Sequence, residues 1–246
     1  AAMNEMQWGA APGRAGAEGI PLGGVIFDMD GLMFDTERLS TACWKQVGEE
    51  FGVPISDQFL AQARGTTTGE FQIFFQEVFG KRLEYSVTIA RKRELFAAYL
   101  RRRGVPIKPG LKELLNFLRE EHIPVAMATA TKRETAMDYV TQTGVAPFFQ
   151  AFAFGDEADR GKPDPEIFYL AARRLSARPG ECLVLEDSWN GVAAGIAGGF
   201  FTIMVPDLSP PAPEQREQLF AVCGSLAEVI PRLEECRDPL DGKFYL

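Results

Sequence analysis

Residues 25–37 read Val-Ile-Phe-Asp-Met-Asp-Gly-Leu-Met-Phe-Asp-Thr-Glu. The short apolar run from Val25 to Phe27 is typical of a buried strand, and two carboxylates, Asp28 and Asp30, follow it at once. Side chains at positions i and i+2 of an extended segment point to the same face. Two carboxylates held side by side repel each other unless a cation or a shared proton offsets their charge. The stretch therefore predicts a functional site at the end of a strand.

Four further short apolar runs predict strands, and helical patterns lie between most of the runs. The five predicted strands are Val25–Asp28, Val125–Thr129, Ala151–Phe154, Cys182–Glu186 and Phe200–Val205. Their lack of alternation is typical of strands covered on both faces. Helices are predicted at Leu111, Leu114, Leu115 and Leu118, and over Pro165–Leu175, Asn190–Ala197 and Leu226–Leu233. Alternating strands and helices predict an α/β fold with a doubly wound parallel sheet.

The interval between the first and second strands is far longer than the dozen or so residues that a parallel crossover needs. It contains helical patterns instead of strands, among them a phenylalanine-rich stripe over 71–79. Such a stripe could bind a lipid or a cofactor, but packing between helices is the better interpretation. We therefore expect an inserted helical subdomain, or cap, at 36–104, a catalytic core at 22–35 and 105–246, and a flexible segment at 1–21.

Composition excludes several classes of function. The net charge of −8 and the pI near 4.9 disfavour nucleic-acid binding, and no run approaches the ~20 apolar residues of a membrane span. Cys43, Cys182, Cys223 and Cys236 have no metal-binding spacing, which indicates reduced thiols and a cytoplasmic protein. The single histidine, His122, stands at a predicted helix end and is expected to be a cap or surface residue. A zinc site and a His-dependent triad are therefore disfavoured.

Two polar motifs follow predicted strands and suit an anion. Thr129-Ala130-Thr131 places hydroxyls beside a helix N-terminus, where free N–H groups add positive charge. Alternatively, Thr129 or Thr131 caps the helix that starts near Lys132. In Gly161-Lys162-Pro163-Asp164-Pro165, the following proline keeps Lys162 extended and Asp164 is placed to cap a helix. A lysine presented in this way suits a phosphate or a carboxylate.

A second acidic pair, Glu186-Asp187, directly follows the strand that begins at Cys182. Ligands of open α/β sheets bind beyond the carboxyl ends of the strands, so the two acidic pairs are expected to converge there. Oxygen ligands suit Mg²⁺, which keeps several waters. We therefore expect a Mg²⁺ site made by Asp28, Asp187 and the backbone carbonyl of Asp30.

In this order along the chain, the motifs resemble those of the haloacid dehalogenase superfamily, in particular its β-phosphoglucomutase-like and phosphatase branch with a helical cap. The matching residues are Asp28-Met29-Asp30-Gly31 with Asp35 and Glu37 following, Thr129, Lys162-Pro163, and Glu186-Asp187-Ser188 with Gly191. The resemblance covers about 23–233. It implies a phosphoric monoester hydrolase that acts on a small phosphorylated metabolite, as a monomer or weak homodimer.

The resemblance also implies a role for each motif. Asp28 would be the nucleophile and Asp30 the general acid and base. Thr129 and Lys162 would bind the phosphoryl oxygens, and Glu186 would help Asp187 to hold Mg²⁺. Phosphate and substrate contacts are expected at Met29, Thr129, Ala130 and Lys162, and, from the cap, at Thr36, Arg64, Thr68 and Lys92.

Phosphatases and sugar phosphomutases share this branch, and two departures weaken the mutase interpretation. Ser40 stands where the mutase has a histidine, and Thr68 where it has a phosphate-binding arginine, although Arg64 could partly replace that arginine. Asp35-Thr36-Glu37 also looks more like the phosphatase members. A mutase, a non-catalytic binding protein of the same fold and a dehalogenase remain as alternatives.

Overall fold

The computed structural model describes residues 19–63 and 68–246. The chain divides into two compact units, which we call the core unit (Ala1–Met33 and Ile107–Leu246) and the helical unit (Phe34–Pro106). The boundaries expected from the sequence, 36 and 104, lie two residues inside the ends of the helical unit. Most of the segment predicted to be flexible, 1–18, lies outside the described residues.

The core unit is built on a six-stranded, fully parallel sheet of order β3-β2-β1-β4-β5-β6. Its strands are β1 (Gly24–Phe27), β2 (Val125–Ala128), β3 (Ala151–Ala153), β4 (Cys182–Glu186), β5 (Phe201–Met204) and β6 (Ala221–Val222). The predicted doubly wound α/β fold is confirmed, and each of the five predicted strands is present. Strand β6 is not predicted from the sequence, because a strand of two residues is too short to show any periodicity.

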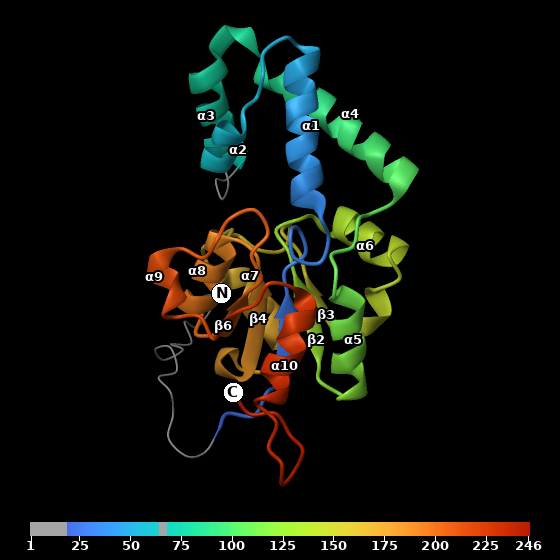
Figure 1. The fold of residues 1–246 in the computed structure, drawn as a ribbon, viewed down its shortest axis with the longest axis vertical. Helices are drawn as coiled ribbons and strands as arrows, with labels where there is room; N and C mark the ends of the chain where they lie inside the picture. Colours follow the sequence, from blue (N-terminus) through green and yellow to red (C-terminus); the bar gives the residue numbers. More distant parts are fainter. Residues whose placement is uncertain (1–18, 64–67) are drawn as a thin grey trace, which may run out of the picture. The chain divides into compact units, whose positions relative to one another are not determined.

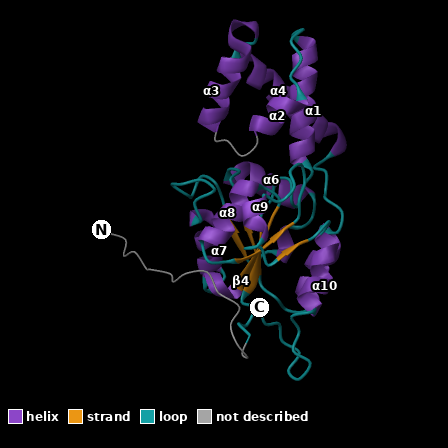
Figure 2. Cartoon of the chain, turned by 60° about the vertical axis from the view of Figure 1, so that its left-hand side comes forward, coloured by secondary structure: helices purple, strands orange, loops and turns teal. Residues whose placement is uncertain are grey.

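Helices cover both faces of this sheet (Figures 1 and 2). The helices of the core unit are α5 (Leu111–Glu120), α6 (Arg133–Gln142), α7 (Glu166–Arg174), α8 (Trp189–Ala197), α9 (Pro213–Arg216) and α10 (Val229–Glu234), with short 3₁₀ turns η2 (Ala146–Phe148), η3 (Pro179–Glu181) and η4 (Leu226–Glu228). The predicted apolar stripe of α5 is buried along its whole length. Within the described residues, no helix combines the length and apolar character that crossing a membrane requires.

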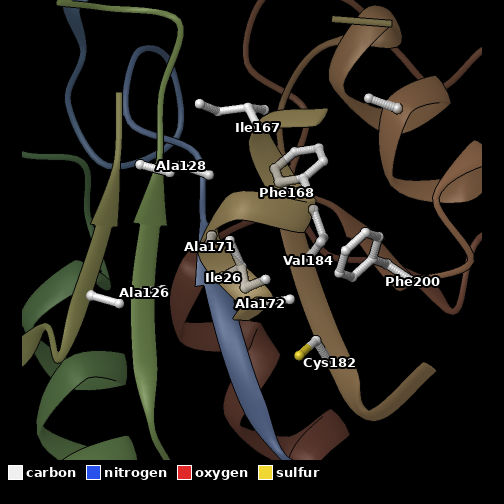
Figure 3. Close-up of a cluster of buried hydrophobic side chains, with 13 residues drawn as sticks. Ile26, Ala126, Ala128, Ile167, Phe168, Ala171, Ala172, Cys182, Val184 and Phe200 are labelled. Carbon is white, nitrogen blue, oxygen red and sulfur yellow. The ribbon is translucent and has the colours of Figure 1, made fainter. Parts of the chain in front are cut away.

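Helix α7 is fixed against one face of the sheet by a tightly packed cluster (Figure 3). Ile167, Phe168, Ala171 and Ala172 of α7 pack against residues of β1, β2 and β4: Ile26, Ala126, Ala128, Cys182 and Val184. The alanines of β2 leave room for the helix to approach the strands. Phe168 is completely buried, so its truncation to alanine would cost about 3–5 kcal/mol. This packing also fixes the loop that enters α7, which carries Lys162.

The helical unit contains α1 (Thr36–Glu50), α2 (Asp57–Ala63), α3 (Thr68–Phe79), η1 (Gly80–Arg82) and α4 (Tyr85–Arg103). Its core is aromatic: Phe75 and Phe79 of α3 are buried against Trp44 of α1 and Phe59 of α2. The centroids of neighbouring rings in this group lie 4.7–5.9 Å apart, a range in which tilted and edge-on pairs are favourable. The interpretation of the phenylalanine stripe as helix packing is confirmed.

The two connections between the units run side by side. The Asp35 N–H donates to the Pro106 carbonyl at 2.8 Å, and the Lys108 N–H donates to the Met33 carbonyl at 2.9 Å. The Lys108 ammonium also pairs with Asp207 at 2.8 Å, on the loop after β5. The second connection is therefore tied to the core unit by both its backbone and its side chain.

Two smaller predictions are also confirmed. All four cysteines are free thiols. His122 is exposed and follows the last residues of α5 with φ of 55°, while its N–H donates to the Arg119 carbonyl. It therefore takes the left-handed position that commonly ends a helix.

Candidate active site

Three neighbouring strands end in polar residues at the point where the strand order reverses. Successive strands run outward from β1 to β2 and β3, and the chain then returns to the other side of β1 with β4. Asp28 follows β1, Thr129 follows β2, and Glu186 ends β4. In open α/β sheets such a reversal opens a crevice at the carboxyl ends of the strands. The predicted convergence of the motifs has this geometric basis.

Lys162 forms ion pairs with the acidic residues at the ends of β1 and β4. Its Nζ lies 2.5 Å from Asp28 Oδ1 and 2.5 Å from Glu186 Oε1, and the three side chains are only 11%, 10% and 1% exposed. The ammonium also lies 4.8 Å from the centroid of the Phe168 ring on α7. Removing a lysine from water is costly, and two carboxylates and an aromatic face compensate for that loss. Lys162 therefore has a defined position between the two acids.

Glu186 organises the turn that follows β4. Its Oε2 accepts hydrogen bonds from the N–H groups of Asp187 (2.9 Å) and Ser188 (3.0 Å) and from the Ser188 hydroxyl (3.0 Å). Ser188 in turn caps α8 by accepting the Gly191 N–H at 3.2 Å. A Cβ on residue 191 would lie 1.9 Å from Glu186 Cδ, so glycine is required there for the carboxylate to fit.

Asp187 fits closely against the turn after β1. Gly31 has φ of +84°, and a Cβ at that residue would lie 2.3 Å from Asp187 Oδ2. Asp28, Glu186 and Asp187 each offer one carboxylate oxygen within 4.8 Å of the others, and all three residues are buried. Three buried, converging carboxylates suit a hard divalent cation such as Mg²⁺, which prefers oxygen ligands. The residues present therefore fit the metal that the sequence predicts.

The electrostatics of the cluster also favour an additional cation. Burial raises the pKa of Asp28 to about 8; Lys162 opposes this shift, and the charges of Glu186 and Asp30 add to it. Burial alone would lower the pKa of Lys162, but its contacts with Asp28 and Glu186 outweigh that effect and raise it. The Lys162 ammonium is thus shared between two carboxylates, and the pKa of Asp28 stays raised in spite of it. A divalent cation would lower the pKa of Asp28 and allow it to ionise.

The two threonines after β2 belong to the site. Thr129 is buried, and its Oγ1 accepts the Thr131 N–H at 3.1 Å. The Thr131 hydroxyl donates to Asp30 Oδ2 at 2.6 Å. The N-cap residue of α6 is Lys132, which forms no side-chain cap bond, so the alternative in which either threonine caps that helix is wrong. Asp164 does accept the Glu166 N–H at the start of α7, at 3.0 Å.

The contact between Thr131 and Asp30 is not predicted from the sequence. A usable signal was present, since Thr129 and Thr131 stand two residues apart after a strand and can face the same site. Of the other predicted core contacts, Met29 has a fully buried side chain, so only its backbone is available to a ligand. Ala130 is exposed in the same turn as Thr131.

The substrate contacts predicted from the cap lie in the helical unit or outside the described residues. Thr36 is the buried first residue of α1, and its hydroxyl donates to the Phe34 carbonyl at 3.4 Å. In α4, the Lys92 ammonium lies 4.9 Å from the Phe96 ring centroid and 5.9 Å from that of Trp44. Thr68 begins α3, whereas Arg64 lies outside the described residues. The roles of these residues toward a substrate stay predictions.

Comparisons with known proteins agree with this geometry. Residues 22–199 match the family model of haloacid dehalogenase-like hydrolases. A phosphorylated carbohydrates phosphatase of Thermotoga maritima is 32% identical over 71% of this chain and 81% of its own length. A probable pseudouridine-5′-phosphatase of Drosophila melanogaster is 31% identical over 84% and 90%. The β-phosphoglucomutase structure from Clostridium difficile has a TM-score of 0.69 at 22% identity and covers 87% of this chain and 96% of its own. The chain belongs to the haloacid dehalogenase-like hydrolases and is a hydrolase of phosphoric monoesters.

Proposed function

We propose that this protein is a Mg²⁺-dependent phosphatase that hydrolyses a small phosphorylated metabolite, with a sugar phosphate as the first candidate, through an aspartyl-phosphate intermediate. The observation that carries the proposal is the bridging of Asp28 and Glu186 by Lys162 in a buried carboxylate cluster at the strand ends. The named activity of the Thermotoga maritima relative, a phosphorylated carbohydrates phosphatase, supports the substrate class.

In the proposed first step, an Asp28 carboxylate oxygen attacks phosphorus, and the bond from phosphorus to the leaving oxygen breaks. Asp30 donates a proton to the leaving alkoxide, so the alcohol departs neutral. In the second step, Asp30 takes a proton from water as that water attacks the phosphorus of the aspartyl phosphate. Inorganic phosphate leaves, and both acids return to their starting states.

The remaining core residues bind the phosphoryl group. Thr129 and Lys162 would hold its oxygens, together with the backbone beside Met29 and Ala130. Lys162 already lies 2.5 Å from Asp28, so its ammonium is next to the atom that would carry the phosphoryl group. Phosphoryl transfer depends mainly on positioning and on stabilising charge, and this arrangement is suited to both.

Asp28 and Asp187, with the backbone carbonyl of Asp30 and support from Glu186, would hold the Mg²⁺ ion. When bound, the ion supplies positive charge that offsets the phosphate and the clustered carboxylates. Glu186 differs from the other acids, because Lys162 and three hydrogen-bond donors already engage its oxygens. Its main task is therefore to hold Lys162 and the Asp187 turn in place.

The substrate contacts expected from the sequence at Thr36, Arg64, Thr68 and Lys92 remain part of the proposal. Ser40 and Thr68 stand where a mutase would need a histidine and an arginine, and this favours release of phosphate to water over return to the sugar.

Product analysis tests the proposal. The protein is incubated with Mg²⁺ and a panel of phosphorylated metabolites that includes β-glucose 1-phosphate, and inorganic phosphate and sugar products are quantified. Free phosphate that forms with Mg²⁺ and is lost with EDTA is the expected result. Glucose 6-phosphate without free phosphate would identify a mutase, and no turnover of any phosphate ester would favour a binding protein.

A further inference from the structure

We propose that Thr131 is a positioning residue for proton transfer, and that its hydroxyl holds the Asp30 carboxylate in the orientation that the acid–base steps require. The inference rests on the proposed function, in which Asp30 protonates the leaving oxygen. Thr131 Oγ1 donates to Asp30 Oδ2 at 2.6 Å, a length typical of charge-assisted O–H···O⁻ hydrogen bonds. The two residues are 101 positions apart in sequence, so the contact depends on the fold.

The backbone of Thr131 is itself held on both sides. Its N–H donates to the buried Thr129 hydroxyl at 3.1 Å, and its carbonyl accepts the Gly155 N–H at 3.0 Å. The approach of Gly155 is close, because a Cβ there would lie 1.9 Å from the Ala130 carbonyl oxygen. The turn after β2 is thus fixed to the segment after β3. The hydroxyl is therefore presented from a preorganised backbone rather than from a mobile loop.

The hydroxyl suits both steps of the reaction. A hydroxyl hydrogen rotates freely, so Thr131 can donate to Oδ2 whether or not the carboxyl group carries a proton. The bond restricts rotation of the carboxyl plane, and proton transfer then occurs from one fixed orientation. General acid catalysis contributes about 10²–10⁴-fold, and a displacement of 1 Å can cost about 10²-fold.

A purely structural role makes a different prediction. If Thr131 only stabilised the turn, its loss would slow all substrates alike. If it positions the acid, the loss depends on the leaving group. The alkoxide leaving group of a sugar phosphate needs a proton, whereas p-nitrophenolate leaves readily as an anion.

The experiment compares kcat/KM for the best sugar phosphate of the metabolite panel and for p-nitrophenyl phosphate in the full chain with Mg²⁺. Thr131→Val is expected to lower kcat/KM about 30-fold for the sugar ester and less than about threefold for the aryl ester. Thr131→Ser, which keeps the hydroxyl, is expected to stay within about threefold of wild type on both. Thr143→Val is the matched control, since the Thr143 hydroxyl donates to the Tyr139 and Val140 carbonyls of its own helix, α6.

Equal losses on both esters, or no loss on the sugar ester, would overturn the inference. So would a further loss when Thr131→Val is added to Asp30→Ala, which leaves no acceptor at residue 30, because a positioning residue has no effect once its partner is gone. Thermal unfolding midpoints verify that each variant folds, and Thr131→Ser gives an answer even if the valine variant does not. A wild-type protein that hydrolyses no phosphate ester of the metabolite panel would overturn the proposed function itself, and the inference with it.

Discussion

At the scale of single residues, the site depends on two glycines as much as on its acidic side chains. Gly31 and Gly191 leave the space that the carboxylates of Asp187 and Glu186 occupy. Any side chain at residue 31 would meet Asp187 Oδ2, in a backbone conformation that favours glycine. The acidic cluster therefore requires these two glycines.

Gly31→Ala is expected to weaken Mg²⁺ binding at least about tenfold, the range seen when groups that support metal ligands are altered. The reason is the forced movement of the Asp187 carboxylate. Isothermal titration with MgCl₂ measures the effect. Gly144→Ala is the control, because Gly144 also has a positive φ (+73°), but among the described residues no neighbouring atom would lie within 4 Å of a Cβ added there. Equal loss of affinity in both variants would show that backbone strain, and not contact with Asp187, is responsible.

Residue-level sequence reasoning identified the polar residues of the site but not all of their partners. Because ligands of open α/β sheets bind beyond the carboxyl ends of the strands, Asp28, Thr129 and Glu186 were predicted to lie at one edge of the sheet. The direct contacts of Lys162 with both acids could not be predicted, because the loop between β3 and α7 has no periodic pattern that would place its side chains. The hydrogen bond between Thr131 and Asp30 was not predicted either, because a helix cap also explained the threonines of that motif.

At the scale of elements, the connection from the helical unit back to α5 is held by an ion pair. Lys108 is 17% exposed and Asp207, on the loop after β5, is 1% exposed. The Lys108 backbone N–H also donates to the Met33 carbonyl, so one residue links the two connections and the loop after β5. Buried pairs of this kind are costly to break when one partner is removed.

Lys108→Met is expected to lower the free energy of unfolding by about 3 kcal/mol, because it removes the cation beside a buried carboxylate. Urea denaturation of the purified variants measures this loss. Asp207→Asn should cost less, since the remaining lysine is better able to reach solvent. A loss under about 1 kcal/mol for Lys108→Met would mean that the pair contributes little to stability.

Element boundaries were predictable where burial is strong. β4 has the predicted ends, and the other four predicted strands differ by one residue at one or both ends, because a continuous apolar run stops where the chain turns polar. β6 could not be found, since two residues at a sheet edge carry too little pattern. The aromatic packing of the helical unit followed from the spacing of its phenylalanines, although Val78 of that stripe is exposed.

At the scale of the whole molecule, the acidic cluster links stability to pH and to metal. The pKa of Asp28 is raised from 3.8 to about 8 by burial, so the folded protein holds a proton that the unfolded chain releases. Between these two values the folded state binds more protons, and its stability therefore falls as pH rises. A cation bound at the cluster reverses this trend, because it favours the ionised carboxylate.

We therefore expect the unfolding temperature of the EDTA-treated protein to fall between pH 5 and pH 8 relative to that of Asp28→Asn. With Mg²⁺ at about 100 times its dissociation constant, the wild type should gain about 2.7 kcal/mol. Differential scanning fluorimetry across this pH range provides the measurement. The account of the cluster is wrong if the wild type and Asp28→Asn show the same pH dependence without metal.

The central claim is that Asp28 is the nucleophile of a phosphatase, and the rate of phosphate release by Asp28→Asn tests it most directly. Wild type, Asp28→Asn and the surface control Asp138→Asn are compared with Mg²⁺ on p-nitrophenyl phosphate and on the best metabolite of the panel. Asp28→Asn should lose at least about 10³-fold in kcat on both substrates while staying folded, and Asp138→Asn should keep wild-type activity. Phosphate release by Asp28→Asn within tenfold of the wild-type rate would contradict the account.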